Sequence, residues 1–137
     1  MNLQSIRKYD EKSSFFIFNL RNKFYVRKNS LDKKITNLED HTMWLKKFFK
    51  KKNLIYLIAN NNKLIGYIRL DIKRNIHNVS WAIEKKYHGK GIAKKFLKKA
   101  KKITPKFSTL GMIKCLRSIK NIITYITNKI DSNIEAK

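Results

Sequence analysis

The chain has 137 residues, 42% of them hydrophobic and 12% aromatic, so it is long and apolar enough to fold as one domain with a core. Its single cysteine excludes an internal disulfide, and no cluster of Cys and His residues predicts a metal site. No apolar run approaches a membrane span, and the first residues lack the apolar stretch of a signal peptide. We therefore expect a cytoplasmic protein.

The net charge of +24 is the largest deviation from an average composition. Such a charge normally indicates nucleic acid or an anionic membrane as a partner. Here the basic residues are almost all lysine and are spread along the whole chain, which is typical of an AT-rich genome rather than of a dedicated nucleic-acid-binding surface. We expect the charge mainly to attract anionic ligands such as nucleotide phosphates, and keep a nucleic-acid-binding module as an alternative.

The N-terminal quarter predicts a short strand and a helix. Residues 5–8 are expected to form the strand, and Asp10 is expected to cap a helix over residues 11–21. Residues 24–31 are expected to be irregular. The helix carries several large apolar side chains that can be buried, among them Phe15, Phe16, Phe18 and Leu20.

A second helix is expected to begin at a capping box formed by Thr36 and Glu39. Lysines occupy the outer side of this helix, and apolar residues recur on the other side at helical spacing. These apolar residues are Leu38, Leu45, Phe48 and Phe49.

The middle of the chain predicts an antiparallel meander of three strands. Residues 54–59 form a compact apolar run, and the asparagine-rich residues 60–63 are expected to turn. Residues 76–84 predict the third strand. Between them, residues 64–72 alternate, and the apolar residues expected on one face are Leu64, Ile68, Leu70 and Ile72.

A glycine turn that opens a helix is the most specific feature of the sequence. Gly89 and Gly91 let main-chain N–H groups approach a ligand closely, and the helix over residues 92–103, ended by Pro105, adds its positive dipole end. This combination predicts a phosphate or pyrophosphate site, the alternative being an ordinary strand-to-helix turn. A further helix is suggested over residues 113–130.

The order of helices, meander, glycine turn and helix resembles the GNAT N-acetyltransferases. Their acetyl-CoA signature is Arg or Gln, two residues, Gly, one residue, then Gly or Ala. This frame falls on residues 88–93, where Gly91 and Ala93 match and His88 replaces Arg or Gln. The resemblance implies an α/β (α+β) fold with a central, mostly antiparallel sheet flanked by helices.

The resemblance covers about residues 6–103, within a single domain over residues 1–137. The family continues after the glycine-turn helix with a strand that opens the cofactor slot, then another helix and two more strands. Residues 104–137 match this pattern poorly. We therefore expect a C-terminal part that is divergent or incomplete, and an inactive relative of the enzymes is one alternative.

Three short segments, at residues 20–22, 26–28 and 41–45, are similar to the branch of the family that acetylates amino sugars for bacterial surface glycans. Its best-known members act on the 4-amino group of a UDP-linked dideoxy sugar on the way to pseudaminic acid. The resemblance thus implies a nucleotide-linked amino sugar as the amine substrate. A protein or ribosomal-protein N-acetyltransferase is the alternative within the same fold, and a homodimer is left open.

The resemblance also implies the residues that bind acetyl-CoA as co-substrate. The main chain of residues 83–85 would pair with the pantetheine arm, and the N–H groups of residues 89–94 would bind the pyrophosphate. The implied cofactor-binding residues are Ile83, Lys85, His88, Gly89, Lys90, Gly91, Ile92, Ala93 and Lys94.

Acetyl transfer needs a neutral amine, a polarised thioester carbonyl and a proton for the leaving thiolate. Glu84 is the candidate base, with Asp71 and His77 as others, and each has the alternative of being a solvated strand residue. Tyr125 is the only tyrosine beyond the glycine-turn helix, so it is the candidate that matches the general acid of the family.

Four side chains of the N-terminal half are candidate substrate contacts. Arg21 and Arg27 are candidates for the UDP phosphates, with ordinary surface arginines as the alternative. His41 and Trp44 are candidates for contact with the rest of the substrate. Their alternatives are a half-buried helix histidine and a core tryptophan.

Overall fold

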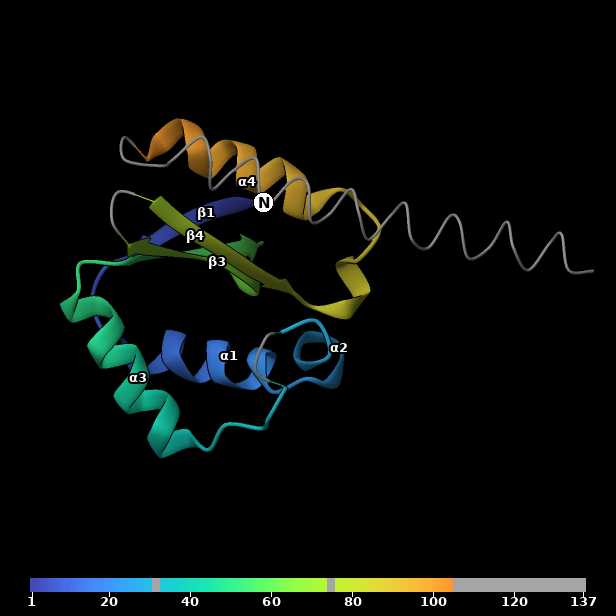
Figure 1. The fold of residues 1–137 in the computed structure, drawn as a ribbon. Coiled ribbons are helices and arrows are strands. Elements are labelled where there is room, and N and C mark those ends of the chain that lie inside the picture. The colour runs from blue at the N-terminus through green and yellow to red at the C-terminus, as the bar shows by residue number, and fades with distance from the viewer. Residues whose placement is uncertain (31–32, 74–75, 105–137) are drawn as a thin grey trace, which may run out of the picture.

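A four-stranded antiparallel sheet lies between two layers of helices (Figure 1). This computed structural model describes residues 1–30, 33–73 and 76–104. The strands pair in chain order, as β1 (Asn2–Ile6), β2 (Leu54–Asn60), β3 (Lys63–Lys73) and β4 (Ile76–Ile83). The expected α/β class and antiparallel meander are therefore confirmed.

The helices are divided unequally between the two faces of the sheet. Of the described helices, α4 (Ile92–Ile103) is the one that lies on the first face (Figure 1). The opposite face carries α1 (Glu11–Arg21), α2 (Phe24–Arg27) and α3 (Leu38–Lys50).

The sheet separates two hydrophobic clusters. The cluster under α4 contains Leu54, Tyr56, Ile58, Ile65, Ile68, Leu70, Ile83, Ile92, Phe96, Leu97 and Ala100. The cluster under α1 and α3 contains Ile17, Leu20, Leu45, Phe48, Phe49, Ile55, Leu57, Tyr67 and Ala82. Strand β2 contributes to both clusters because its successive side chains point to opposite faces, which explains its continuous apolar run.

A β-bulge in β3 changes which side chains face α4. The pairing of β2 with β3 shifts between Ile58 and Ala59, and this shift leaves Ile65 as the extra residue of β3. Ile65 therefore joins the cluster under α4, whereas Leu64 packs against the cluster on the other face. The prediction that Leu64 shares a face with the later apolar residues of the strand is wrong, because simple alternation does not include the bulge.

Helix α3 begins one residue later than the predicted capping box. Asn37 is the N-cap, and its side-chain oxygen accepts a hydrogen bond from the Asp40 N–H at 2.8 Å. The main chain of Thr36 is instead held by the Asn22 side chain, which accepts from its N–H at 3.0 Å and donates to its C=O at 2.8 Å. Thr36 thus connects the end of α1 to the start of α3 through its main chain, and the predicted capping box is wrong.

Other boundaries follow the sequence more closely. Asp10 caps α1 as predicted, accepting from the Ser13 N–H at 2.9 Å. Asn61 and Asn62 both have positive φ angles, 50° and 66°, as the tight hairpin turn between β2 and β3 requires. Strand β1 begins earlier than expected, at Asn2.

Some expected elements and core residues differ from the structure. Residues 24–27, expected to be irregular, form the short helix α2. Phe15 and Leu38, two of the apolar side chains expected to pack inward, are about half exposed, as is Ile103 at the end of α4. The suggested helix over residues 113–130 lies outside the described residues. None of the described helices is long and apolar enough to cross a membrane.

We predict that Gly66→Ala destabilises the sheet. A Cβ atom at Gly66 would lie 2.7 Å from the Ala82 carbonyl oxygen and 3.0 Å from Ile83 Cγ1, so β3 and β4 would have to move apart. We expect a loss of about 1–3 kcal/mol in the free energy of unfolding, measured by urea denaturation. The exposed Ser5→Ala control in β1 should change it by less than about 0.5 kcal/mol, and equal effects of the two variants would contradict the prediction.

Candidate functional site

The free edge of β4 presents alternate main-chain groups. The Glu84 N–H donates to the Ile65 C=O at 2.9 Å, which continues the ladder between β3 and β4. In an antiparallel ladder the residues in between direct their N–H and C=O groups the other way. The polar main-chain groups of Trp81 and Ile83 therefore point away from β3, toward an edge where no strand of the described residues pairs.

A cluster of free amides follows directly after this edge. Gly89 and Gly91 have φ angles of 74° and 71°, a left-handed conformation that favours glycine. A Cβ atom at either position would meet no neighbouring atom within 4 Å, so both face open space. Helix α4 begins after Gly91, no described side chain caps it, and the first helical hydrogen bond runs from the Lys95 N–H to the Gly91 C=O. The N–H groups of residues 92–94 are thus available to an anion.

These residues fit the diphosphate of a nucleotide. Open amides, the positive end of the α4 dipole and the exposed Lys90 and Lys94 all favour negative charge at the same corner. The outward N–H of Ile83 lies at the end of the adjoining strand, where an extended arm could pair as a strand does. The outward C=O of Ile83 already accepts a hydrogen bond from the His88 side chain. The other two main-chain positions expected to bind that arm already have partners, because the Glu84 N–H bonds β3 and the Lys85 N–H bonds a side chain.

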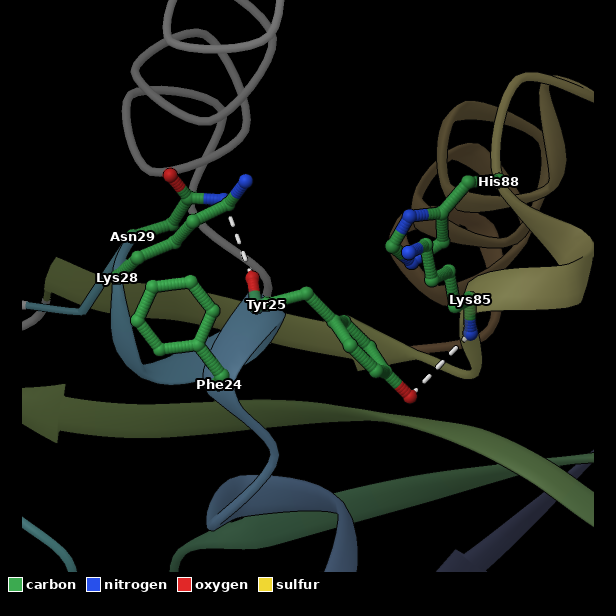
Figure 2. Close-up of a pocket in the computed structure, with 6 residues that line it drawn as sticks. All are labelled: Phe24, Tyr25, Lys28, Asn29, Lys85 and His88. Carbon is green, nitrogen blue, oxygen red and sulfur yellow. Dashed lines mark hydrogen bonds between the residues drawn. The ribbon is translucent and has the colours of Figure 1, made fainter.

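That side chain is Tyr25 of α2, which reaches across to the end of β4 (Figure 2). Its hydroxyl accepts from the Lys85 N–H at 3.2 Å, and its ring meets the His88 ring edge-on, with centroids 5.3 Å apart. A pocket of about 450 Å³ lies here, lined by Phe24, Tyr25, Lys28, Asn29, Lys85 and His88. The sequence contained no signal for this group, because residues 24–31 were expected to be irregular and lie some 60 residues before Lys85 in the chain.

His88 links the glycine turn to β4. Its Nε2 lies 2.7 Å from the Ile83 carbonyl oxygen, and because a carbonyl can only accept, Nε2 carries the proton and donates. Arginine and glutamine also end in N–H donors. The histidine at this position of the signature can therefore make the kind of contact that either replaced residue could make.

Two arginines and a tryptophan gather on the other face of the sheet. The guanidinium carbons of Arg21 and Arg69 lie 5.0 Å and 5.2 Å from the centre of the Trp44 ring, within the range of cation–π attraction. Arg69 forms an ion pair with Asp71 at 3.3 Å, while its buried Nε has no hydrogen-bond partner among the described residues. The structure thus joins two of the four predicted substrate residues and adds Arg69, which sequence reasoning missed.

His41 lies beneath this group as a buried residue. Its side chain is 0% exposed, its Nε2 donates to the Ser14 C=O at 3.1 Å, and its ring is 5.7 Å from Trp44. Burial, and then the charge of Arg21, lower the pKa of His41, although the Ser14 hydrogen bond raises it. The imidazole is therefore held neutral, and it supports Trp44 from within the core.

The remaining predicted residues are separate from that group. Arg27 closes the loop after α2, because its Nε donates to the Asn22 C=O at 2.9 Å and its Nη1 to the Lys33 C=O at 3.3 Å. Glu84 is half-buried at the end of β4 and has no ion-pair partner among the described residues. His77 lies in β4, and Tyr125 falls outside the described residues. No cluster that could hold a metal occurs among the side chains the structure describes.

Comparison with known proteins gives one family. The model of the acetyltransferase (GNAT) family matches residues 15–118. No curated protein matched the chain.

Several solved acetyltransferase structures have a similar fold. A ribosomal-protein-alanine N-acetyltransferase from Brucella melitensis aligns with a TM-score of 0.57 at 15% identity, over 72% of this chain and 64% of that one. An N-acetyltransferase from Staphylococcus aureus gives 0.57 at 16% identity, over 72% and 64%. A putative acetyltransferase from Salmonella typhimurium, solved with its cofactor acetyl-CoA, gives 0.56 at 15% identity, over 72% and 61%. The alignment thus spans just under two thirds of the length of these relatives.

We predict that the protein becomes less stable as the pH is lowered, and that the protonation of His41 causes this loss. Because the pKa of folded His41 lies below its ordinary value, the unfolded chain binds a proton that the folded chain resists. The free energy of unfolding should therefore decrease as the pH falls below about 6.5, by up to about 1.4 kcal/mol per pH unit.

His41→Gln keeps an N–H donor for the Ser14 C=O but does not titrate. In urea denaturation between pH 8 and 5, the variant should be less stable at neutral pH and lose less stability on acidification. The other histidines are common to both proteins, so the difference isolates His41. A pH dependence identical to that of the wild type would contradict the assignment.

Proposed function

Because the chain belongs to the GNAT acetyltransferase family, we propose that it transfers the acetyl group of acetyl-CoA to a primary amine. The observation that supports this most is the continuity of the β4 edge with the open amides. The outward N–H of Ile83 precedes the open N–H groups of residues 89–94, and the Ile83 C=O beside it holds His88 of the glycine turn. A ligand with an amide-containing arm and a diphosphate matches this succession of groups.

When bound, acetyl-CoA supplies an activated thioester carbonyl. Transfer forms a bond from the amine nitrogen to the carbonyl carbon and breaks the carbon–sulfur bond, and the amine loses a proton while the thiolate gains one. Glu84 is the proposed proton acceptor. It continues the alternation of β4 on the face of Ala82, which is the face covered by α1 and α3.

The proton donor has two candidates. Tyr125 is the one that the sequence suggests. Tyr25 is the one that the described structure suggests, because its hydroxyl lies at the main chain of Lys85, one residue after Glu84. A phenol at this position can donate to the leaving sulfur, and it can also hold α2 against the end of β4.

For the acceptor we propose a nucleotide-linked amino sugar. The pairing of Arg21 and Arg69 around Trp44 supports it, because guanidinium groups bind phosphate and an indole ring offers a flat apolar surface. The competing acceptor is a protein N-terminus, since the Brucella melitensis structure is described as a ribosomal-protein-alanine N-acetyltransferase. Both kinds of acceptor are compatible with the positive charge of Arg21 and Arg69. The two hypotheses are therefore distinguished by testing which acceptor is acetylated.

Cofactor binding tests the proposed activity. In amide NMR spectra, CoA should shift the resonances of residues 89–94 more than those of α3. His88→Ala should weaken CoA binding by about twofold to tenfold in calorimetry, because one hydrogen bond that orders the glycine turn is lost. His88→Gln retains a donor and should remain within about twofold of the wild type.

Two results would contradict the proposal. One is the absence of any spectral or thermal response to millimolar acetyl-CoA, which would leave an inactive relative of the family. The other is an equal loss of binding in His88→Ala and His88→Gln, which would remove the role given to the hydrogen bond with Ile83.

The acceptor is tested by assaying UDP-linked amino sugars, the free amino sugars and N-terminal peptides. For a nucleotide sugar, Arg21→Gln should raise KM by about tenfold or more, because a charge-assisted hydrogen bond to phosphate is lost. The same variant should leave KM for the free amino sugar within about twofold. Acetylation of peptides alone would exclude the sugar as acceptor while retaining the transferase activity.

A further inference from the structure

The outer surface of α4 carries positive charge without a compensating carboxylate. Every formally charged side chain between Glu84 and Thr104 is a lysine, and the next carboxylate in the sequence is Asp131. All of these lysines are exposed, and none forms an ion pair within the described residues. We call this surface the α4 lysine face, and it consists of Lys85, Lys86, Lys90, Lys94, Lys95, Lys98, Lys99, Lys101 and Lys102.

The face is larger than a nucleotide cofactor requires. The proposed diphosphate site uses only the first turn of α4 and the glycine turn before it. Lys98, Lys101 and Lys102 lie in the last two turns, and a helix of this length extends for about 18 Å. Along the helix axis, Lys98 is about 6–9 Å from the amides of residues 92–94, and Lys101 and Lys102 are about 10–15 Å from them. The diphosphate at the first turn therefore leaves the positive charge at this end of α4 available to another anion.

We propose that the α4 lysine face binds the phosphate backbone of a nucleic-acid duplex without sequence preference. Duplex DNA carries about one charge per 1.7 Å of its axis, so an 18 Å helix faces about five base pairs. Lysine acts on phosphate as a point charge on a flexible side chain, so a row of lysines can follow the regularly spaced phosphates. Such contacts do not distinguish one base sequence from another.

The composition of the face argues against the other polyanions. A protein partner requires an apolar centre, and protein interfaces are depleted in lysine. A membrane-surface helix inserts an apolar face into the lipid boundary. In α4 the corresponding side chains, Ile92, Phe96 and Leu97, are buried against the sheet, and Ile103 alone among its large apolar residues is exposed.

The distribution of charge also argues against a mere effect of composition. Helix α3 is rich in lysine too, but Glu39 and Asp40 occupy its first turn. On the α4 side the described chain from Lys85 to Thr104 has no such residue. If the lysines only reflected the overall composition, removing them from α3 or from α4 would reduce the affinity for nucleic acid equally.

The test uses the full chain and labelled duplexes of about 20 base pairs, one DNA and one RNA, in fluorescence anisotropy between about 50 and 200 mM salt. The variant Lys98→Gln/Lys101→Gln/Lys102→Gln removes three charges without touching the proposed cofactor residues. The matched control, Lys47→Gln/Lys50→Gln/Lys51→Gln, removes three exposed lysines at the same spacing on α3 and its C-cap. Glutamine keeps the helix propensity close to that of lysine.

The α4 variant should show a salt dependence shallower by about 2.7 in the slope of log affinity against log salt, at 0.9 for each lost phosphate contact. The ratio of wild-type affinity to variant affinity should then be about 40-fold larger at 50 mM than at 200 mM salt. The control should retain the wild-type slope. Binding to DNA and RNA alike supports phosphate recognition, whereas binding to one only identifies the physiological duplex.

Three results would overturn the proposal: equal losses in the two triple variants, no salt-dependent binding by the wild type, or tighter binding to vesicles containing phosphatidylserine at equal charge concentration. If the triple variant does not fold by circular dichroism, the single variants Lys98→Gln, Lys101→Gln and Lys102→Gln replace it. Each should lower the slope by about 0.9. Acetyl-CoA binding should be unaffected by these substitutions, because none of the three lysines is a proposed cofactor residue, so this proposal and the proposed activity fail separately.

Discussion

The register of β4 on β3 is the constraint on which the candidate site depends. The hydrogen bond from the Glu84 N–H to the Ile65 C=O decides that the polar groups of Ile83 face the free edge. A slip by one residue would turn those groups inward and would move the Ile83 side chain out of the cluster under α4. Gly66 makes this register feasible, because the Ala82 carbonyl approaches a position where a side chain would not fit. The bulge at Ile65 shifts the register of the same strand, β3, on its other neighbour, β2.

Two aromatic side chains hold the end of β4 in position. Tyr25 reaches from α2 to the Lys85 N–H, and His88 returns from the glycine turn to the Ile83 C=O. Their rings meet edge-on, so α2 and the glycine turn are joined through side chains that are far apart in the sequence. This arrangement means that the conformation of α2 and the accessibility of the β4 main chain are coupled.

The two faces of the sheet carry positive charge in physically different arrangements. On the side of α1 and α3, Arg21 and Arg69 are half-buried against Trp44, and Asp71 neutralises part of their charge. Such groups have defined geometry and suit a specific small ligand. On the side of α4, exposed lysines without carboxylates act at longer range and are screened by salt. The first arrangement supports selection of an acceptor, and the second supports attraction of a polyanion.

The sequence by itself determined the elements whose signals are local. The Asp10 cap, the asparagine turn, the meander and the amphipathic helix after Gly91 were all predicted, because capping, positive φ angles and hydrophobic periodicity act within a few residues. The signature around Gly89 and Gly91 likewise indicated an anion site, and the structure leaves these two glycines open to solvent.

Tertiary structure alone decided the rest. The bulge at Ile65 depends on pairing with another strand, and the contacts of Tyr25 with Lys85 and of Arg69 with Trp44 join segments that are distant in the chain. His41 has the same residue type whether it faces a substrate or the core, and only packing determined that it is buried and neutral. Long-range contacts of this kind leave no periodic pattern in the sequence, because each depends on two surfaces that folding brings together.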